Sequence, residues 1–318
     1  MQETYLVRAK LDLNLSFEEN WESTVPKGLP VGFGPFVLDQ SPNKSFYLER
    51  LGLIDSVLME GLRPDDNYPI SILYVELMLK MEKAEMGESP EHIADEMFEQ
   101  LETILRLFQE GNVFLRRHYY HTWQLEDDGR REVIFLWPIP EKPEPATLYH
   151  RGLYTLDDKT LQQFIVFFNC YWDIIHGKHQ PIYNALSRFN SSYEKRNLGD
   201  RLIDLIVALE ALFGDRGGGD SLTYKVALRC SSFLYPPGEA RAEAFKAIKK
   251  IYGDRSAMIH GEKINSRYTS KEIDQLEEQV RRSITAFLEM YRKGHKIKSG
   301  EDLDELLFFG KGSSSASA

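Results

Sequence analysis

Apolar and polar positions follow different patterns in the two halves of the chain. In the first half, residues 3–13 alternate between the two kinds, and residues 68–84 begin with β-branched and aromatic residues; both patterns predict strands. Residues 112–140 predict two further strands around the turn "EDDGR". Residues 89–111 instead keep the apolar spacing of a helix. The first half therefore predicts a mixed α/β domain.

The second half follows "PIPEKPEPAT", a proline-rich, charged stretch typical of a linker. Beyond it the pattern predicts a bundle of about six helices with short loops. The predicted helices cover residues 155–177, 180–195, 197–214, 221–235, 238–253 and 270–294. In the third of them one apolar face is formed by Leu202, Leu205, Ile206, Leu209, Leu212 and Phe213.

The fold class predicted from these patterns is α+β, with a mixed α/β domain followed by an all-α helical bundle. We expect an N-terminal domain over 1–145, the bundle over 146–300 and a C-terminal tail over 301–318. The end of the tail, "GKGSSSASA", is of low complexity and is predicted to be disordered. No function is predicted for the N-terminal domain, which matches no family pattern.

The composition limits the classes of protein to which this chain can belong. The chain has 318 residues, 42% of them hydrophobic, which is enough for a large core. No apolar run approaches the roughly 20 residues that span a bilayer, and the first residues lack a secretory leader, so we expect a cytoplasmic protein without a membrane partner. The two cysteines, Cys170 and Cys230, are isolated and are predicted to be buried thiols.

The charge is unevenly distributed. The net charge of -10 argues against general, charge-driven nucleic-acid binding. The segment 241–300, however, holds 14 Lys/Arg and 8 Asp/Glu, a balance of +6, and leaves -16 for the rest. Ordinary solvated helix faces and a basic binding surface both remain open as explanations.

The segment "IYGDRSAMIHGE", residues 251–262, carries the candidate chemistry. Asp254 suits a helix N-cap, Gly261 suits the residue after a helix end, and Gly253 indicates a break or kink. The segment is therefore either a short separate helix or the bent end of a longer one. Arg255 and His260 differ by roughly 140° around a helix, so a second copy related by a two-fold axis is needed to close a cleft around them. This geometry predicts a homodimer.

Two segments carry a resemblance to a known family: "IVALEALF", residues 206–213, and "DRSAMIHG", residues 254–261. Together they resemble the HEPN superfamily, and within it the Apea-like HEPN group, whose helical bundles carry an R-x4-H signature. The resemblance covers roughly 155–293. It implies a metal-independent endoribonuclease with RNA as substrate, a homodimer through the bundle and no cofactor or metal. It also implies a role as a bacterial defence or toxin effector, including antiviral defence, with a regulatory partner not identified by the sequence.

The resemblance also implies roles for individual residues. His260 is the general base or acid, and its ordinary pKa near 6.5 suits that work. Arg255 holds the scissile phosphate and stabilises its charge. Ser256 and Glu210 are supporting residues. Active members often carry Asn, Asp or His where this chain has Ser256, and Glu210 either orients Arg255 or serves packing.

The same residues allow a different interpretation. A histidine before a helix-ending glycine can cap carbonyl groups, and an arginine on a helix can form an ordinary ion pair. Serine does not titrate usefully, and the overall charge is acidic. The alternative function is therefore a non-catalytic HEPN-like module that binds RNA, a nucleotide or a protein.

Overall fold

The structure is a computed structural model, and it describes the backbone of part of the chain. The described residues are 2–13, 36–37, 45–53, 73–82, 90–111, 113–114, 119–125, 131–138, 154, 158–177, 179–195, 197–215, 221–259, 268–295, 297 and 300–309. Side chains are described for most helical residues between 99 and 307. Most of the predicted linker and the terminal segment 310–318 lie outside the described residues.

The chain divides into two units. The first comprises Met1–Glu144 and Gly152–Asn169, and the second comprises Pro145–Arg151 and Cys170–Ala318. The division falls inside one helix, so that helix contributes residues to both units. The two units are described separately below.

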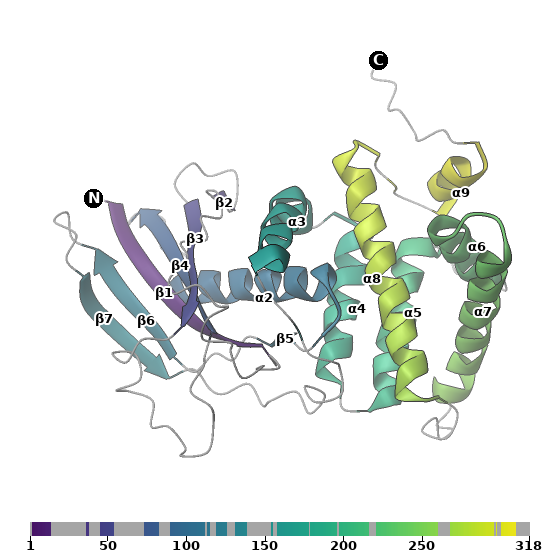
Figure 1. Cartoon of the computed structure of the whole chain (residues 1–318), viewed down its shortest axis with the longest axis horizontal. Helices are drawn as coiled ribbons and strands as arrows, with labels where there is room; N and C mark the ends of the chain where they lie inside the picture. Colours follow the sequence, from purple (N-terminus) through teal and green to yellow (C-terminus); the bar gives the residue numbers. More distant parts are fainter. Residues whose placement is uncertain are drawn as a thin grey trace. The chain divides into compact units, whose positions relative to one another are not determined.

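The strands of the first unit are described by their backbone. They are β1 (Gln2–Leu13), β2 (Phe36–Val37), β3 (Ser45–Leu53), β4 (Leu73–Glu82), β5 (Val113–Phe114), β6 (Tyr119–Leu125) and β7 (Arg131–Pro138). In the described backbone they follow the order β2-β3-β4-β1-β6-β7, with β5 paired to β1 (Figure 1). The pairings are antiparallel, as in the long register of β1 with β4 from Gln2↔Glu82 to Leu11↔Leu73.

The predicted α+β class is nevertheless wrong. Between residues 99 and 307 the interpretable part of the chain is 82% helical, and a mixed α/β N-terminal domain finds no support there. The physical reason is that alternation defines the two faces of a strand, whereas a domain also requires those faces to pack in a core. Nearly all the side chains described between residues 99 and 307 belong to helices, and the core that they form is a helical one.

The helices supply the fold that the structure supports, a helical bundle. They are α2 (Pro90–Phe108), α3 (Asp158–His176), α4 (Ile182–Glu194), α5 (Leu198–Phe213), α6 (Leu222–Leu234), α7 (Glu239–Ile259), α8 (Ser270–Arg292) and α9 (Gly300–Phe309). In the first unit, α2 meets the beginning of α3 where the ring of Phe108 lies 5.4 Å from Phe164 and 5.5 Å from Phe167. No helix in the described part of the chain is long and apolar enough to cross a membrane.

The core of the second unit lies between α4, α5 and α8, with α6 and α7 packed beside them (Figure 1). The six apolar residues predicted to share one face of α5 are all buried, which confirms that prediction. At one end of this core the ring of Phe287 lies 5.5 Å from Phe213 and 5.0 Å from Phe233. Each fully buried side chain of this size contributes roughly 1.5–3 kcal/mol.

The helix α9 was not predicted. It is attached to α6 through Arg229, whose buried guanidinium donates to both carboxylate oxygens of Asp304, at 2.8 and 2.7 Å, and to Asp215 at 2.8 Å. Leu303 is fully buried. Gly300 fits this contact because a Cβ there would lie 2.3 Å from the Arg229 Nη1 atom. α9 is short and begins with acidic residues, so its sequence did not stand out as a helix within the predicted tail.

The cysteine prediction is confirmed for one thiol and wrong for the other. Cys230 is buried, and its sulfur lies 3.8 Å from the hydroxyl of Ser283. Cys170 is exposed on α3. The sequence of α3 is apolar on most sides, so its pattern does not tell which positions face the core.

Candidate functional site

The arginine motif lies at the end of a single long helix. α7 runs from Glu239 through Gly253 and Asp254 to Ile259, so of the two predicted alternatives the short separate helix is wrong and the end of a longer helix is confirmed. A glycine in a helix costs about 1 kcal/mol. The buried residues Ile248 and Tyr252 anchor the preceding turns and offset that cost.

The structure places the four predicted site residues differently. The positions of Arg255 and Ser256 belong to the last two turns of α7, which is described by its backbone there. His260 lies outside the described residues. Glu210 is half-buried near the end of α5. The structure therefore describes side-chain contacts for Glu210 alone among the four.

Glu210 connects α5 to the motif helix. The hydroxyl of Tyr252 donates a hydrogen bond to its Oε1 atom. Tyr252 is buried and precedes Arg255 by three residues, about one helical turn. The "ALEALF" segment and the turn that leads into the arginine motif are thus joined directly, although they lie 42 residues apart in sequence.

The end of α5 is shaped around the same glutamate. The backbone N–H of Gly214 donates to the carbonyl of Glu210 at 2.8 Å and closes the helix. A Cβ at position 214 would lie 2.5 Å from that carbonyl oxygen, closer than a side chain permits. The glycine after "ALEALF" therefore allows the helix to end directly after the turn that carries Glu210.

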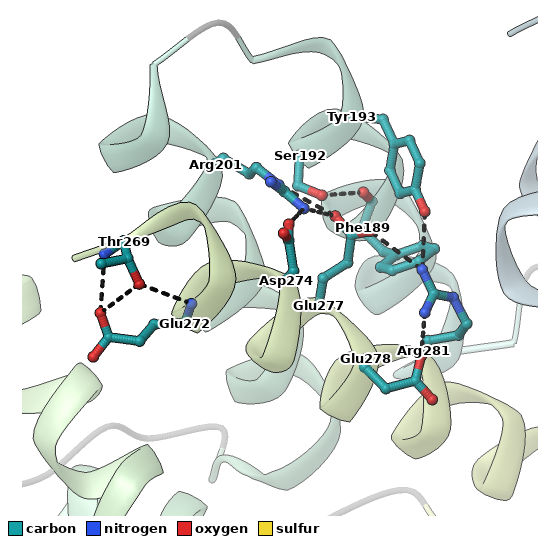
Figure 2. Close-up of polar contacts among 10 residues, drawn as sticks. All are labelled: Phe189, Ser192, Tyr193, Arg201, Thr269, Glu272, Asp274, Glu277, Glu278 and Arg281. Carbon is teal, nitrogen blue, oxygen red and sulfur yellow. Dashed lines mark hydrogen bonds and ion pairs between the residues drawn. The ribbon is translucent and has the colours of Figure 1, made fainter. Parts of the chain in front are cut away.

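The helix after the motif begins at a well-defined cap. Thr269 and Glu272 form a capping box at the start of α8: the Thr269 Oγ1 atom accepts from the Glu272 N–H at 3.3 Å, and the Thr269 N–H donates to the Glu272 carboxylate at 2.9 Å. This bond from the Thr269 backbone lowers the pKa of Glu272. Figure 2 shows this cap, and the segment 260–267 between it and the end of α7 lies outside the described residues.

A network of buried charges lies between α4, α5 and α8 (Figure 2). Arg201 of α5, 3% exposed, donates to Glu277 at 2.6 Å and to Asp274 at 2.8 Å. Arg281 donates to the other oxygen of Glu277 at 3.2 Å and to the Tyr193 hydroxyl at 3.1 Å. Glu277, 2% exposed, therefore bridges two buried guanidinium groups.

The electrostatics of this network indicate a structural role. Burial acts to lower the pKa of Arg201, but Glu277 and Asp274 outweigh it and raise that pKa. Both oxygens of Glu277 accept from arginines, so the network has the pairing that buried charges require. We interpret this network as the set of contacts that fixes the register of α5 against α8. These two helices border the motif, because α5 is bonded to α7 through Glu210 and α8 follows α7 in the chain.

Sequence reasoning missed Tyr252. Its signal is its spacing: Ile248, Tyr252 and Arg255 follow one another at four and three residues, the pattern of one helix face. That pattern extends to Arg255 only if α7 continues through Gly253, which was one of the two alternatives that the sequence left open.

Comparisons with family models, with curated proteins and with solved structures gave no match to this chain. Within the described residues, no group of three or more His, Cys, Asp or Glu side chains is arranged to hold a metal ion.

Proposed function

We propose that this chain is a metal-independent endoribonuclease of HEPN type that acts as a homodimer, with Arg255 and His260 as the reacting residues. The observation that supports it most directly is the hydrogen bond from Tyr252 to Glu210, because it joins "IVALEALF" to the helical turn that directly precedes "DRSAMIHG". A role as a bacterial defence or toxin effector belongs to the same proposal.

The proposed chemistry needs one base, one acid and one cation. His260 removes the proton of a ribose 2'-hydroxyl, whose oxygen then attacks the adjacent phosphorus. The bond from phosphorus to the 5'-oxygen breaks, and the protonated His260 returns its proton to that oxygen, which leaves as a hydroxyl. Arg255 stabilises the added negative charge on the phosphate. The products are a 2',3'-cyclic phosphate and a 5'-hydroxyl end.

The test is cleavage of a mixed RNA pool by the purified chain in EDTA, with product ends identified by mass spectrometry. Wild type, Arg255→Ala and His260→Ala are compared, and His295→Ala serves as a histidine control outside the motif. We expect cyclic-phosphate ends from wild type and His295→Ala, and losses of at least 100-fold in the other two. Equal cleavage by all four proteins would place the activity elsewhere.

The second candidate is a non-catalytic RNA-, nucleotide- or protein-binding module. Ser256 favours it, because serine at this position supplies a hydrogen bond but no group that titrates near neutral pH. Binding of RNA by wild type with no cyclic-phosphate product under the same conditions would support this candidate instead.

A further inference from the structure

An exposed aromatic pair lies where α6 meets α7. The Tyr224 side chain on α6 is 50% exposed, and its ring packs edge-on against Phe245 of α7, with centroids 5.5 Å apart and an interplanar angle of 79°. Phe245 is itself half-buried. The contact holds the tyrosine ring in place and leaves one half of it open to solvent, although burying the ring would be favourable.

Three lysines follow Phe245 on α7, and the ammonium of one of them, Lys250, lies 5.6 Å from the ring centroid of Tyr268. Lys246, Lys249 and Lys250 are exposed, and the Lys249 ammonium lies 5.9 Å from the Phe245 ring centroid. Together with Phe245 they fall within an arc of about 140° of the helix. The exposed acidic residues among the described side chains of α7, Glu239 and Glu243, lie at its beginning, before the lysines. The aromatic pair and the three lysines are called the α6–α7 surface below.

The direction of α7 relates this surface to the candidate site. The lysines occupy the turns directly before Tyr252, and Arg255 follows in the next turn. A chain of phosphates along the lysines would run toward the same end of α7, although the position of Arg255 falls on the helix face of Ile248 and Tyr252 and not on that of the lysines. The segment 241–300, which includes the lysines, has the positive balance of +6 in an otherwise acidic chain.

We propose that the α6–α7 surface binds single-stranded RNA, with a base stacked on Tyr224 and the backbone phosphates held by Lys246, Lys249 and Lys250. Single strands are bound by this combination of exposed aromatic rings and a basic track, because a free base offers its flat face to a ring. In a duplex the bases are stacked on one another and that face is hidden. The identity of the nucleic acid as RNA rests on the proposed function.

The test measures binding separately from cleavage. The probe is a fluorescein-labelled 20-nucleotide 2'-O-methyl oligouridine, which lacks the 2'-hydroxyl nucleophile, and the readout is fluorescence anisotropy with the full chain. A 20-nucleotide abasic strand presents the same phosphates without bases. We expect Tyr224→Ala to weaken binding of the oligouridine roughly tenfold and to leave binding of the abasic strand unchanged.

The lysines are tested through the salt dependence. A variant with Lys246, Lys249 and Lys250 all changed to Ser should weaken binding of both probes. It should also lower the slope of log K against log salt by about 2, since each phosphate contact on a single strand contributes about 0.7. Matched controls are Tyr183→Ala on α4, whose side chain is 41% exposed, and Lys293→Ala, whose side chain is 58% exposed.

The outcomes separate this proposal from the proposed function. Four results would each overturn the proposed RNA-binding role of the α6–α7 surface. They are equal binding by Tyr224→Ala and Tyr183→Ala, preference for a duplex of the same length, no binding by wild type, and equal competition by polyglutamate. Cleavage that depends on His260 would still support the nuclease in that case. Conversely, Tyr224→Ala could lose binding of the oligouridine while Arg255→Ala binds it as wild type does, with no cleavage by any of the proteins. That result would support RNA binding by the α6–α7 surface and contradict the proposed nuclease activity.

Discussion

At the scale of single residues, the hydrogen bond between Tyr252 and Glu210 is the contact on which the candidate site depends most. Tyr252 is 6% exposed, so on folding its hydroxyl group replaces a hydrogen bond to water with one to the carboxylate of Glu210. A hydrogen bond to a charged group contributes more to stability than one between neutral groups. The stability and the position of the last turns of α7 should both respond to this residue.

Removing that hydroxyl group should destabilise the bundle. We expect Tyr252→Phe to lower the free energy of unfolding by about 1–2 kcal/mol in urea titrations, because the ring still packs while the hydrogen bond is lost. Tyr235→Phe is the matched control, since its hydroxyl takes part in an exposed contact with Arg282. That control should change stability by less than about 0.5 kcal/mol. Equal effects of the two variants would show that the Tyr252 bond contributes little.

The two thiols differ in exposure, and this difference predicts their reactivity. Burial raises the pKa of the Cys230 thiol to about 12, whereas Cys170 is exposed on α3. Since the thiolate is the reactive form, native protein at pH 8 should release colour from a disulfide reagent for one thiol per chain. Cys170→Ser should remove that reaction, and denaturant should restore one reactive thiol. Fast reaction of native Cys170→Ser would contradict the burial of Cys230.

The raised pKa of Cys230 also makes the free energy of unfolding depend on pH. Its ordinary value is about 9 and its folded value about 12, so above pH 9 the unfolded chain ionises while the folded chain keeps its proton. The contribution of the buried thiol is therefore complete below pH 9 and is lost as the pH rises toward 12. Cys230→Ala should show a smaller fall in unfolding free energy over pH 9–11 than wild type.

At the scale of helices, the sequence was informative where one face is apolar and the ends are marked. The apolar face of α5 follows from its spacing, and the helix predicted over 270–294 agrees closely with α8 at Ser270–Arg292. The choice between a separate helix and a continuous α7 could not be made from the sequence, because it depends on the burial of Tyr252 against α5, which outweighs the local cost of Gly253. The attachment of α9 through Arg229 and Asp304 is likewise a tertiary contact without a local signal.

The buried charge network fixes how α5 and α8 lie against each other, and it predicts a sharp difference between neighbouring glutamates. Glu277→Gln removes the charge that two buried guanidinium groups share, so we expect a loss of about 3 kcal/mol in unfolding free energy. Glu278→Gln affects a side chain that is 45% exposed and should cost less than about 1 kcal/mol. Similar losses for both would mean that the network does not hold the two helices in register.

At the scale of the whole molecule, the candidate site could be predicted in part. The sequence identified the two segments that carry the resemblance, and in the structure one hydrogen bond joins the first segment to Tyr252, two residues before the second. It did not identify Tyr252, because the partner of a buried polar group depends on the packing of distant helices. The predicted mixed N-terminal domain failed because alternation in sequence does not establish a packed core.

The dimer remains the whole-molecule prediction with the clearest test. Arg255 and His260 are five residues apart, and the proposed cleft takes both residues from each of two copies. A mixed dimer of Arg255→Ala and His260→Ala chains would then still hold one arginine and one histidine in the cleft. We expect it to keep a measurable part of wild-type cleavage, although each variant alone is inactive.

The mixed dimer can be made by co-expressing the two variants with different affinity tags and purifying over both. Light scattering of wild type should give twice the mass of one chain, and the doubly tagged protein should produce cyclic-phosphate ends in EDTA. If each chain instead formed its own site, both sites of the mixed dimer would lack one essential residue and no product would form. Inactivity of a folded mixed dimer beside an active wild type would therefore reject the composite cleft while leaving the nuclease itself intact.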